Sequence, residues 1–190
     1  NADVARANLL AMNVDRRGRS EVSLNTTADI KVSAENEING SVAINDVMLE
    51  NDDGKYDIGD ILVTSKQMEK EHTINLTAPF ADATYSGTSS PKNFVRDFTG
   101  LSLRKELPAI FTDTTYAWNG DTYMAEVQFH NMMDVLAFAM PGLYIEAGTS
   151  LHTEIDDKGE FRTELNSGRL AYRAQYLKGL TAVFNNINEK

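Results

Sequence analysis

The hydrophobic and polar positions of the first eighty residues follow the pattern of an antiparallel sheet. Residues 22–32 (VSLNTTADIKV) alternate without interruption, which is the period of a strand buried on one face. We expect four side chains of this strand to face the core: Val22, Leu24, Ile30 and Val32. Three more strand-like segments follow between polar turns: 38–49, 60–65 and 72–78.

Two segments in the middle of the chain have helical spacing instead. Residues 91–107 begin with Pro91, a residue favoured in the first turn of a helix, and Gly100 indicates that this helix is short. Residues 130–142 place apolar side chains at helical intervals before a Pro-Gly pair stops them. We expect a helix there, although residues 134–140 (DVLAFAM) also fit a buried strand.

The last third of the chain returns to β patterns. Residues 122–129 and 169–177 alternate, and 156–159 (DDKG) have the composition of a hairpin turn between two further strands. The sequence therefore predicts a mainly β fold, an antiparallel β-sandwich or barrel of about eight strands with two or three short helices. We expect a single β-rich domain over 20–190, preceded by an N-terminal arm over 1–19.

The arm differs in charge from the rest of the chain. The whole chain has a formal charge of −10, and because residues 1–19 contribute +2, the remainder carries −12. Residues 2–12 (ADVARANLLAM) fit the start of a helix, but so short a helix is marginal in water and needs a surface to pack on. We therefore predict an assembly arm whose basic residues meet acidic ones on the same chain or on a second copy: Arg6, Arg16, Arg17 and Arg19.

The most acidic stretch, 49–60 (LENDDGKYDIGD), is compatible with two readings. With Gly54 at the sixth position it resembles the calcium loops of EF-hand-like sites over these twelve residues only, and the resemblance implies one weak calcium ion at Asn51, Asp53, Asp57 and Asp60. Leu49 stands where such loops have their first ligand, and Asp60 where they have a longer glutamate. The alternative is an exposed turn in which Asp and Gly serve turn geometry. We expect no other cofactor.

Nothing else in the sequence has the spacing of a catalytic or metal site. His72, His130 and His152 lie too far apart in sequence to form a metal-ligand motif, and no nucleophile elbow or phosphate-binding loop occurs. Three aromatic residues between 116 and 123 suggest either a sugar-binding face or, for the tryptophan, an anchor in the core: Tyr116, Trp118 and Tyr123. We expect no enzymatic activity.

Charge and composition narrow the partners. Binding to nucleic acid without sequence preference requires a surface dense in lysine and arginine, which a charge of −10 does not provide. No apolar run reaches the roughly 18 residues of a membrane-spanning helix, so we expect no transmembrane segment. The chain has no cysteine, which excludes disulfides and thiolate metal sites.

Two classes of function fit these observations. The first is a non-enzymatic structural subunit that assembles with copies of itself or with other subunits, as in a virion, a tail or tube, or a pilus-like filament. It is favoured by the β-rich single domain, the charged arm and the lack of catalytic motifs. The alternative is a secreted or surface module that binds a glycan or a protein, stabilised by calcium if the acidic loop binds it. Both favour a virion or an extracellular location over the cytoplasm.

Overall fold

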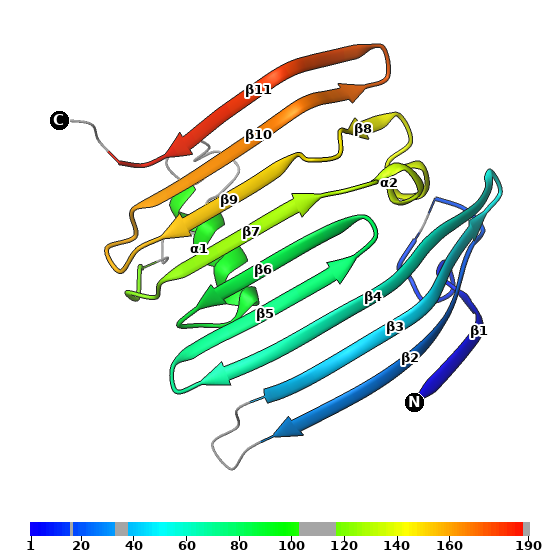
Figure 1. The fold of residues 1–190 in the computed structure, drawn as a ribbon, viewed down its shortest axis with the longest axis horizontal. Helices are drawn as coiled ribbons and strands as arrows, with labels where there is room; N and C mark the ends of the chain where they lie inside the picture. The colour runs from blue at the N-terminus through cyan, green and yellow to red at the C-terminus, as the bar shows by residue number, and fades with distance from the viewer. Residues whose placement is uncertain (16, 33–37, 103–116, 188–190) are drawn as a thin grey trace.

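The strands of this chain form one open antiparallel sheet. The computed structural model describes residues 1–15, 17–32, 38–102 and 117–187. In these residues the sheet has eleven strands in the order β1-β2-β3-β4-β5-β6-β7-β9-β10-β11, with β8 paired to β10 (Figure 1). The expected mainly β, antiparallel fold with short helices is confirmed. All the strands in the described ranges belong to this one sheet, and two helices lie against it.

Strands that follow one another in the sequence are mostly neighbours in the sheet, because short hairpins join most of them. The strands are β1 (Ala2–Asn8), β2 (Ser20–Val32), β3 (Ile38–Asn51), β4 (Gly54–Met68), β5 (Glu71–Ala78), β6 (Ala81–Gly87), β7 (Tyr123–Phe129), β8 (Leu143–Ile145), β9 (Ser150–Ile155), β10 (Phe161–Tyr172) and β11 (Gln175–Asn185). The predicted turn at 156–159 joins β9 to β10. The expectation of one strand over 169–177 is wrong, because the turn between β10 and β11 lies within this segment, between Tyr172 and Gln175.

Helix α1 (Pro91–Ser102) covers one end of the sheet. The helix begins at Pro91, as predicted. Its first turn is closed by the Ser90 carbonyl, which accepts a hydrogen bond from the Phe94 N–H at 3.0 Å. One side of α1 carries Phe94, Phe98 and Leu101, which pack against the main core cluster of the sheet. That cluster consists of Tyr85, Tyr123, Ile155 and Phe161.

A second, smaller core lies near the other end of the strands. Helix α2 (Met133–Ala139) lies beside the ends of β4 and β8, away from α1 (Figure 1). Its buried side chains are Leu136 and Phe138, and the Phe138 ring lies 5.7 Å from the Tyr56 ring of β4. The helix predicted within 130–142 is therefore confirmed. Neither helix of the described residues has the length and apolar character needed to cross a membrane.

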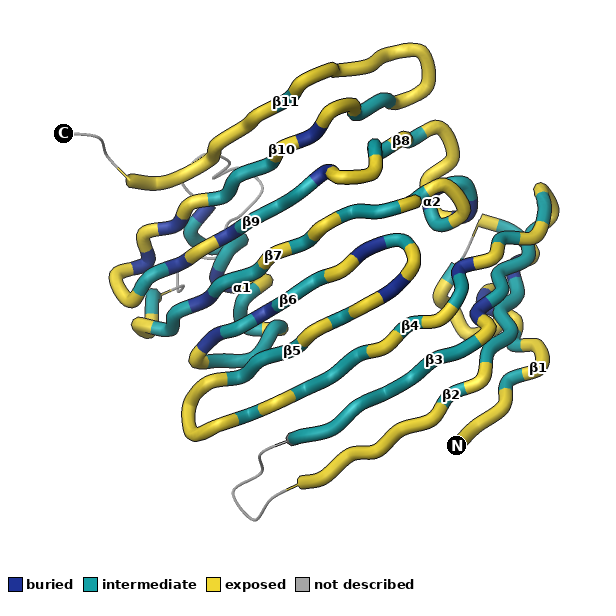
Figure 2. Tube along the Cα trace, viewed as in Figure 1, coloured by how far each residue is buried: buried dark blue, intermediate teal, exposed yellow. Residues whose placement is uncertain are grey.

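Two expectations for the N-terminal part are wrong. Residues 2–8 form β1, paired with β2, instead of a helix. Pairing with β2 gives their backbone N–H and C=O groups hydrogen-bond partners, whereas a helix this short is only marginally stable by itself. Val22 and Leu24 are half-buried as expected, but Ile30 and Val32 are 54% and 63% exposed. The far end of β2 is unpaired on its outer side and lies away from both helices, so alternation alone did not determine burial (Figure 2).

Candidate interaction surface

One face of the sheet is apolar across nearly its whole width. In an antiparallel sheet, residues directly opposite one another share a face, so the registers define a continuous row over nine strands from β2 to β11. We call this side the apolar face. Its central row is Ala28, Val42, Val63, Leu76, Ala83, Val127, Leu151, Leu165 and Ala182.

The opposite side of the sheet, the polar face, has a different composition. A neighbouring row on this side is Asp29, Ser41, Thr64, Asn75, Thr84, Glu126, His152 and Glu164. These side chains bond to each other across strands: Thr84 donates to Asn75 at 3.1 Å, and His152 lies 2.9 Å from Glu126. The polar face is therefore suited to solvent, whereas the apolar face calls for a covering layer.

The described residues cover the apolar face only in part. Helix α1 packs on it at one end, over Tyr85 and Phe161, which lie on the same face as the central row. No residue of the central row is buried; Ala28 and Ala182 are exposed and the other seven are half-buried. The chain exposes 12383 Å² of surface, whereas a compact monomer of its mass exposes about 9,000 Å².

The two edges of the sheet are unlike. β1 is short, carries Asp3 and Arg6, and has a shift in its register with β2 between Val4 and Ala7; short, charged and irregular strands are the usual protection of a sheet edge. β11 is longer and has Lys178 as its one charged residue. Figure 2 shows β11 as exposed along almost all of its length.

The arginines of the N-terminal arm contact acidic or carbonyl groups within the chain. Arg6 pairs with Glu21, and Arg19 lies 3.3 Å from the same carboxylate. Arg17 bonds Asp15 at 2.9 Å and donates to the carbonyl of Phe138 at 2.9 Å. Its hydrogen bonds hold the pKa of Asp15 well below the usual range. Arg16 lies outside the described residues, and a role for these arginines between chains stays a prediction.

The four residues of the candidate calcium site lie along a hairpin. Asn51 and Asp53 are at the turn between β3 and β4, whereas Asp57 and Asp60 are within β4. Their oxygens cap local backbone groups: Asn51 accepts from the Asp53 N–H at 2.9 Å, and Asp60 accepts from the Asp46 N–H at 2.9 Å. In the described part of the chain no three His, Asp or Glu side chains are grouped as metal ligands. Calcium binding stays a prediction.

The other candidates are spread over the molecule. His130, which follows β7, pairs with Asp82 of β6 at 2.9 Å, His152 lies on the polar face and His72 is in β5. Trp118 packs against the core cluster and donates to the Asp157 carbonyl at 2.9 Å, as expected of a core anchor. Tyr123 is in the core, and Tyr116 lies outside the described residues.

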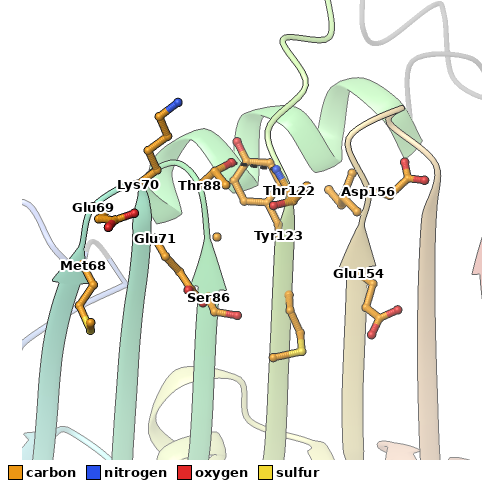
Figure 3. Close-up of a pocket in the computed structure, with 13 residues that line it drawn as sticks. Met68, Glu69, Lys70, Glu71, Ser86, Thr88, Thr122, Tyr123, Glu154 and Asp156 are labelled. Atoms are coloured by element: carbon orange, nitrogen blue, oxygen red, sulfur yellow. Dashed lines mark hydrogen bonds between the residues drawn. The ribbon is translucent and has the colours of Figure 1, made fainter.

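A depression of about 600 Å³ lies near the turn between β4 and β5. Figure 3 shows Glu71, Ser86 and Glu154 on β5, β6 and β9, on the polar face, with α1 behind the sheet. Its charged groups are mainly carboxylates, of Glu69, Glu71, Glu154 and Asp156, with Lys70 as the cation. They do not converge on one point, so this depression offers no arrangement for acid and base catalysis.

A buried polar group ties α1 to the sheet. Tyr123 donates its hydroxyl to Asp97 of α1 at 2.7 Å, and Asp97 is almost fully buried. Burial raises the pKa of Tyr123, and the bond to Asp97 raises it further. Burial also raises the pKa of Tyr85, aided by the charges of Asp121 and Asp97.

Stability should therefore decrease in alkali. Unfolded tyrosines lose their proton near pH 10, while Tyr85 and Tyr123 hold theirs in the folded state, so above about pH 10 each lowers the free energy of unfolding by about 1.4 kcal/mol per pH unit. Below that pH their contribution is constant. Urea denaturation at a series of pH values measures the slope, and Tyr123→Phe should remove about half of it. An unchanged slope in this variant would contradict the assignment to Tyr123.

Comparison with protein-family models, with curated proteins and with solved structures gave no match.

Proposed function

We propose that this chain is a non-enzymatic structural subunit that assembles with copies of itself through its open sheet. The observation that supports it is the central row of the apolar face, which crosses nine strands without a buried residue. An apolar face of this extent is unfavourable in water, and soluble monomers rarely leave such a patch uncovered. Assembly removes it from water and uses the free edges of the same sheet.

The acidic residues and histidines do not favour catalysis over assembly. In the described residues they pair locally within or between strands, as His130 does with Asp82, and none combines a nucleophile, a base and a cavity. A subunit of a larger structure needs no such site. A virion, tail, tube or pilus-like structure is the kind of assembly that we propose for it.

The second candidate is a binding module, and the same apolar face is the observation in its favour. A ligand held there would need a long apolar part to cover the row between Val42 and Leu165. A glycan is the weaker candidate, because Trp118 and Tyr123, which suggested it, pack in the core beneath α1.

The experiment is light scattering after size-exclusion chromatography over a wide range of protein concentration. We expect a mass above that of the 21.1 kDa chain, rising with concentration. Association through apolar surface and strand pairing should persist at high salt, whereas association through the arm arginines should weaken, because salt screens exposed charges. A protein that stays monomeric throughout contradicts assembly, and binding of an apolar fluorophore by that monomer would favour the second candidate.

A further inference from the structure

The outer side of β2 is covered over only part of its length. β1 pairs with β2 from Glu21 to Thr26, and among the described residues no strand lies beside the last part of β2, Thr27–Val32. All residues of this part are exposed (Figure 2). We call it the open edge. It contains no proline, and an uncovered edge is a template for pairing with another strand.

The neighbouring hairpins determine which backbone groups of the open edge point outward. Met68 and Glu71 enclose a two-residue turn, and the pair that closes such a turn is hydrogen-bonded. Bonded and non-bonded pairs alternate along each ladder, and the registers that link β5 to the open edge through β4 and β3 have no shift there. The odd-numbered residues of the open edge therefore bond to β3. The even-numbered ones direct their N–H and C=O groups outward: Ala28, Ile30 and Val32.

A hydrogen bond at the other end of β2 agrees with this assignment. The Leu9 N–H donates to the Ser20 carbonyl at 2.8 Å, so an even-numbered residue of β2 bonds on the β1 side. No residue of β2 has a positive φ. The register shift near Asn25 adds its extra residue to β3, where Asp46 has a φ of 54°. The alternation in β2 is therefore unbroken from Ser20 to Val32.

The open edge is apolar on one face and charged on the other. Its even-numbered residues lie on the apolar face, where Ala28 begins the central row. Ile30 is opposite Gly40, which has no side chain to cover it, and is 54% exposed. On the polar face the open edge carries one charge of each sign, at Asp29 and Lys31. A matching strand therefore needs apolar side chains on one face and the opposite order of charges on the other.

We propose that the open edge pairs antiparallel with the open edge of a second copy, about a two-fold axis at Ile30, and joins the two sheets into one. Ile30 then lies opposite its own copy, and Ala28 lies opposite Val32. All these residues direct their backbone groups outward, as the hydrogen-bonded pairs of an antiparallel ladder require. Because residues opposite one another share a face, the two apolar faces become continuous. The inference rests on the proposed function, for which it names the partner and the contact.

The charges of the open edge favour this partner and this register. With the axis at Ile30, Asp29 of each copy lies opposite Lys31 of the other, which gives two pairs of opposite charge on the polar face. An axis at Lys31 would set the two lysines opposite each other, and an axis at Asp29 would do so for the aspartates; like charges directly opposite are unfavourable. Edge charges usually prevent pairing, whereas these two exclude the neighbouring registers and match in one. Two-fold pairing is also the commonest symmetry of homo-oligomers.

Charge reversal tests the contact, and it should leave the fold intact because both side chains are exposed. Asp29→Lys and Lys31→Asp each set like charges opposite one another twice. At low salt we expect each variant alone to associate about tenfold more weakly than the wild type, as measured by light scattering over a dilution series. An equimolar mixture of the two variants brings opposite charges together again and should associate like the wild type.

The matched control for charge reversal is Lys158→Asp. Lys158 is exposed in the turn between β9 and β10, and this variant changes the net charge as much as Lys31→Asp does. It should associate like the wild type. Single variants at 29 and 31 that also associate like the wild type, or a mixture of them that does not recover association, would overturn the inference.

Cysteine cross-linking tests the register, since the chain has no cysteine of its own. In Ile30→Cys the two introduced thiols lie on the axis, with Cα atoms about 5.5 Å apart, which is within the range of a disulfide. The matched control is Ala28→Cys, on the same face, whose copies would lie about 13 Å apart along the strands. We expect mild oxidation to convert most of Ile30→Cys to a covalent dimer and little of Ala28→Cys. Equal cross-linking of both variants, or none of Ile30→Cys, contradicts the proposed register.

The outcomes separate this inference from the proposed function. A wild-type protein that associates without cross-linking of Ile30→Cys assembles through another surface, which overturns the β2 contact and leaves the proposed function standing. A wild-type protein that is monomeric at every concentration overturns both.

Discussion

Phe161→Ala is expected to lower the free energy of unfolding by about 3–5 kcal/mol, the usual cost of removing a fully buried phenylalanine. Phe161 is 1% exposed. It joins the covering helix to the sheet, since its ring lies 5.7 Å from Phe98 of α1 and 5.2 Å from Phe184 of β11. The gap left by alanine cannot be closed by the sheet, because a strand cannot shift without breaking its ladder.

Urea denaturation at one fixed protein concentration measures this effect. The control is Val95→Ala, on the same helix but 62% exposed, which should change the free energy of unfolding by less than about 0.5 kcal/mol. Similar losses for the two variants would mean that α1 does not pack on the sheet as described.

Phe138→Ala is expected to cost about 3 kcal/mol and to loosen the N-terminal segment. Phe138 is 7% exposed and lies at the centre of the second core, against Tyr56. The Arg17 guanidinium lies 5.4 Å from the same ring and also bonds the Phe138 and Ala139 carbonyls at the end of α2. Loss of the ring removes the cation–π contact and exposes the surface on which the arm rests.

Two measurements are needed for Phe138→Ala. Urea denaturation gives the loss of stability, and limited proteolysis reports whether residues 9–19 become accessible. Met133→Ala is the matched control, because Met133 is on the same helix and 70% exposed; it should resemble the wild type in both. Protection of the segment 9–19 in Phe138→Ala would show that α2 does not hold it.

The candidate surface could be predicted from the sequence in part. Alternation in 22–32 and 72–78 identified strands with one apolar side, but a strand's own pattern does not say which strands lie beside it. The register aligned Val63, Leu76 and Val127 into a single row. The acidic stretch 49–60 showed another limit: its composition fits a metal loop, the structure places it in a hairpin in which Glu50 pairs with Lys55 across β3 and β4, and calcium binding there stays a prediction.

The sequence by itself determined the local elements, because strand alternation, Pro91 before a helix and the turn at 156–159 are set by interactions among near neighbours. Only the tertiary structure decided that residues 2–8 are a strand, since the β2 edge supplies their hydrogen bonds. It also decided that Ile30 and Val32 are exposed, although the alternation of apolar and polar residues in this strand predicts that both face the core. Burial depends on what lies above a strand, and within the described residues the two helices lie at the two ends of the strands only.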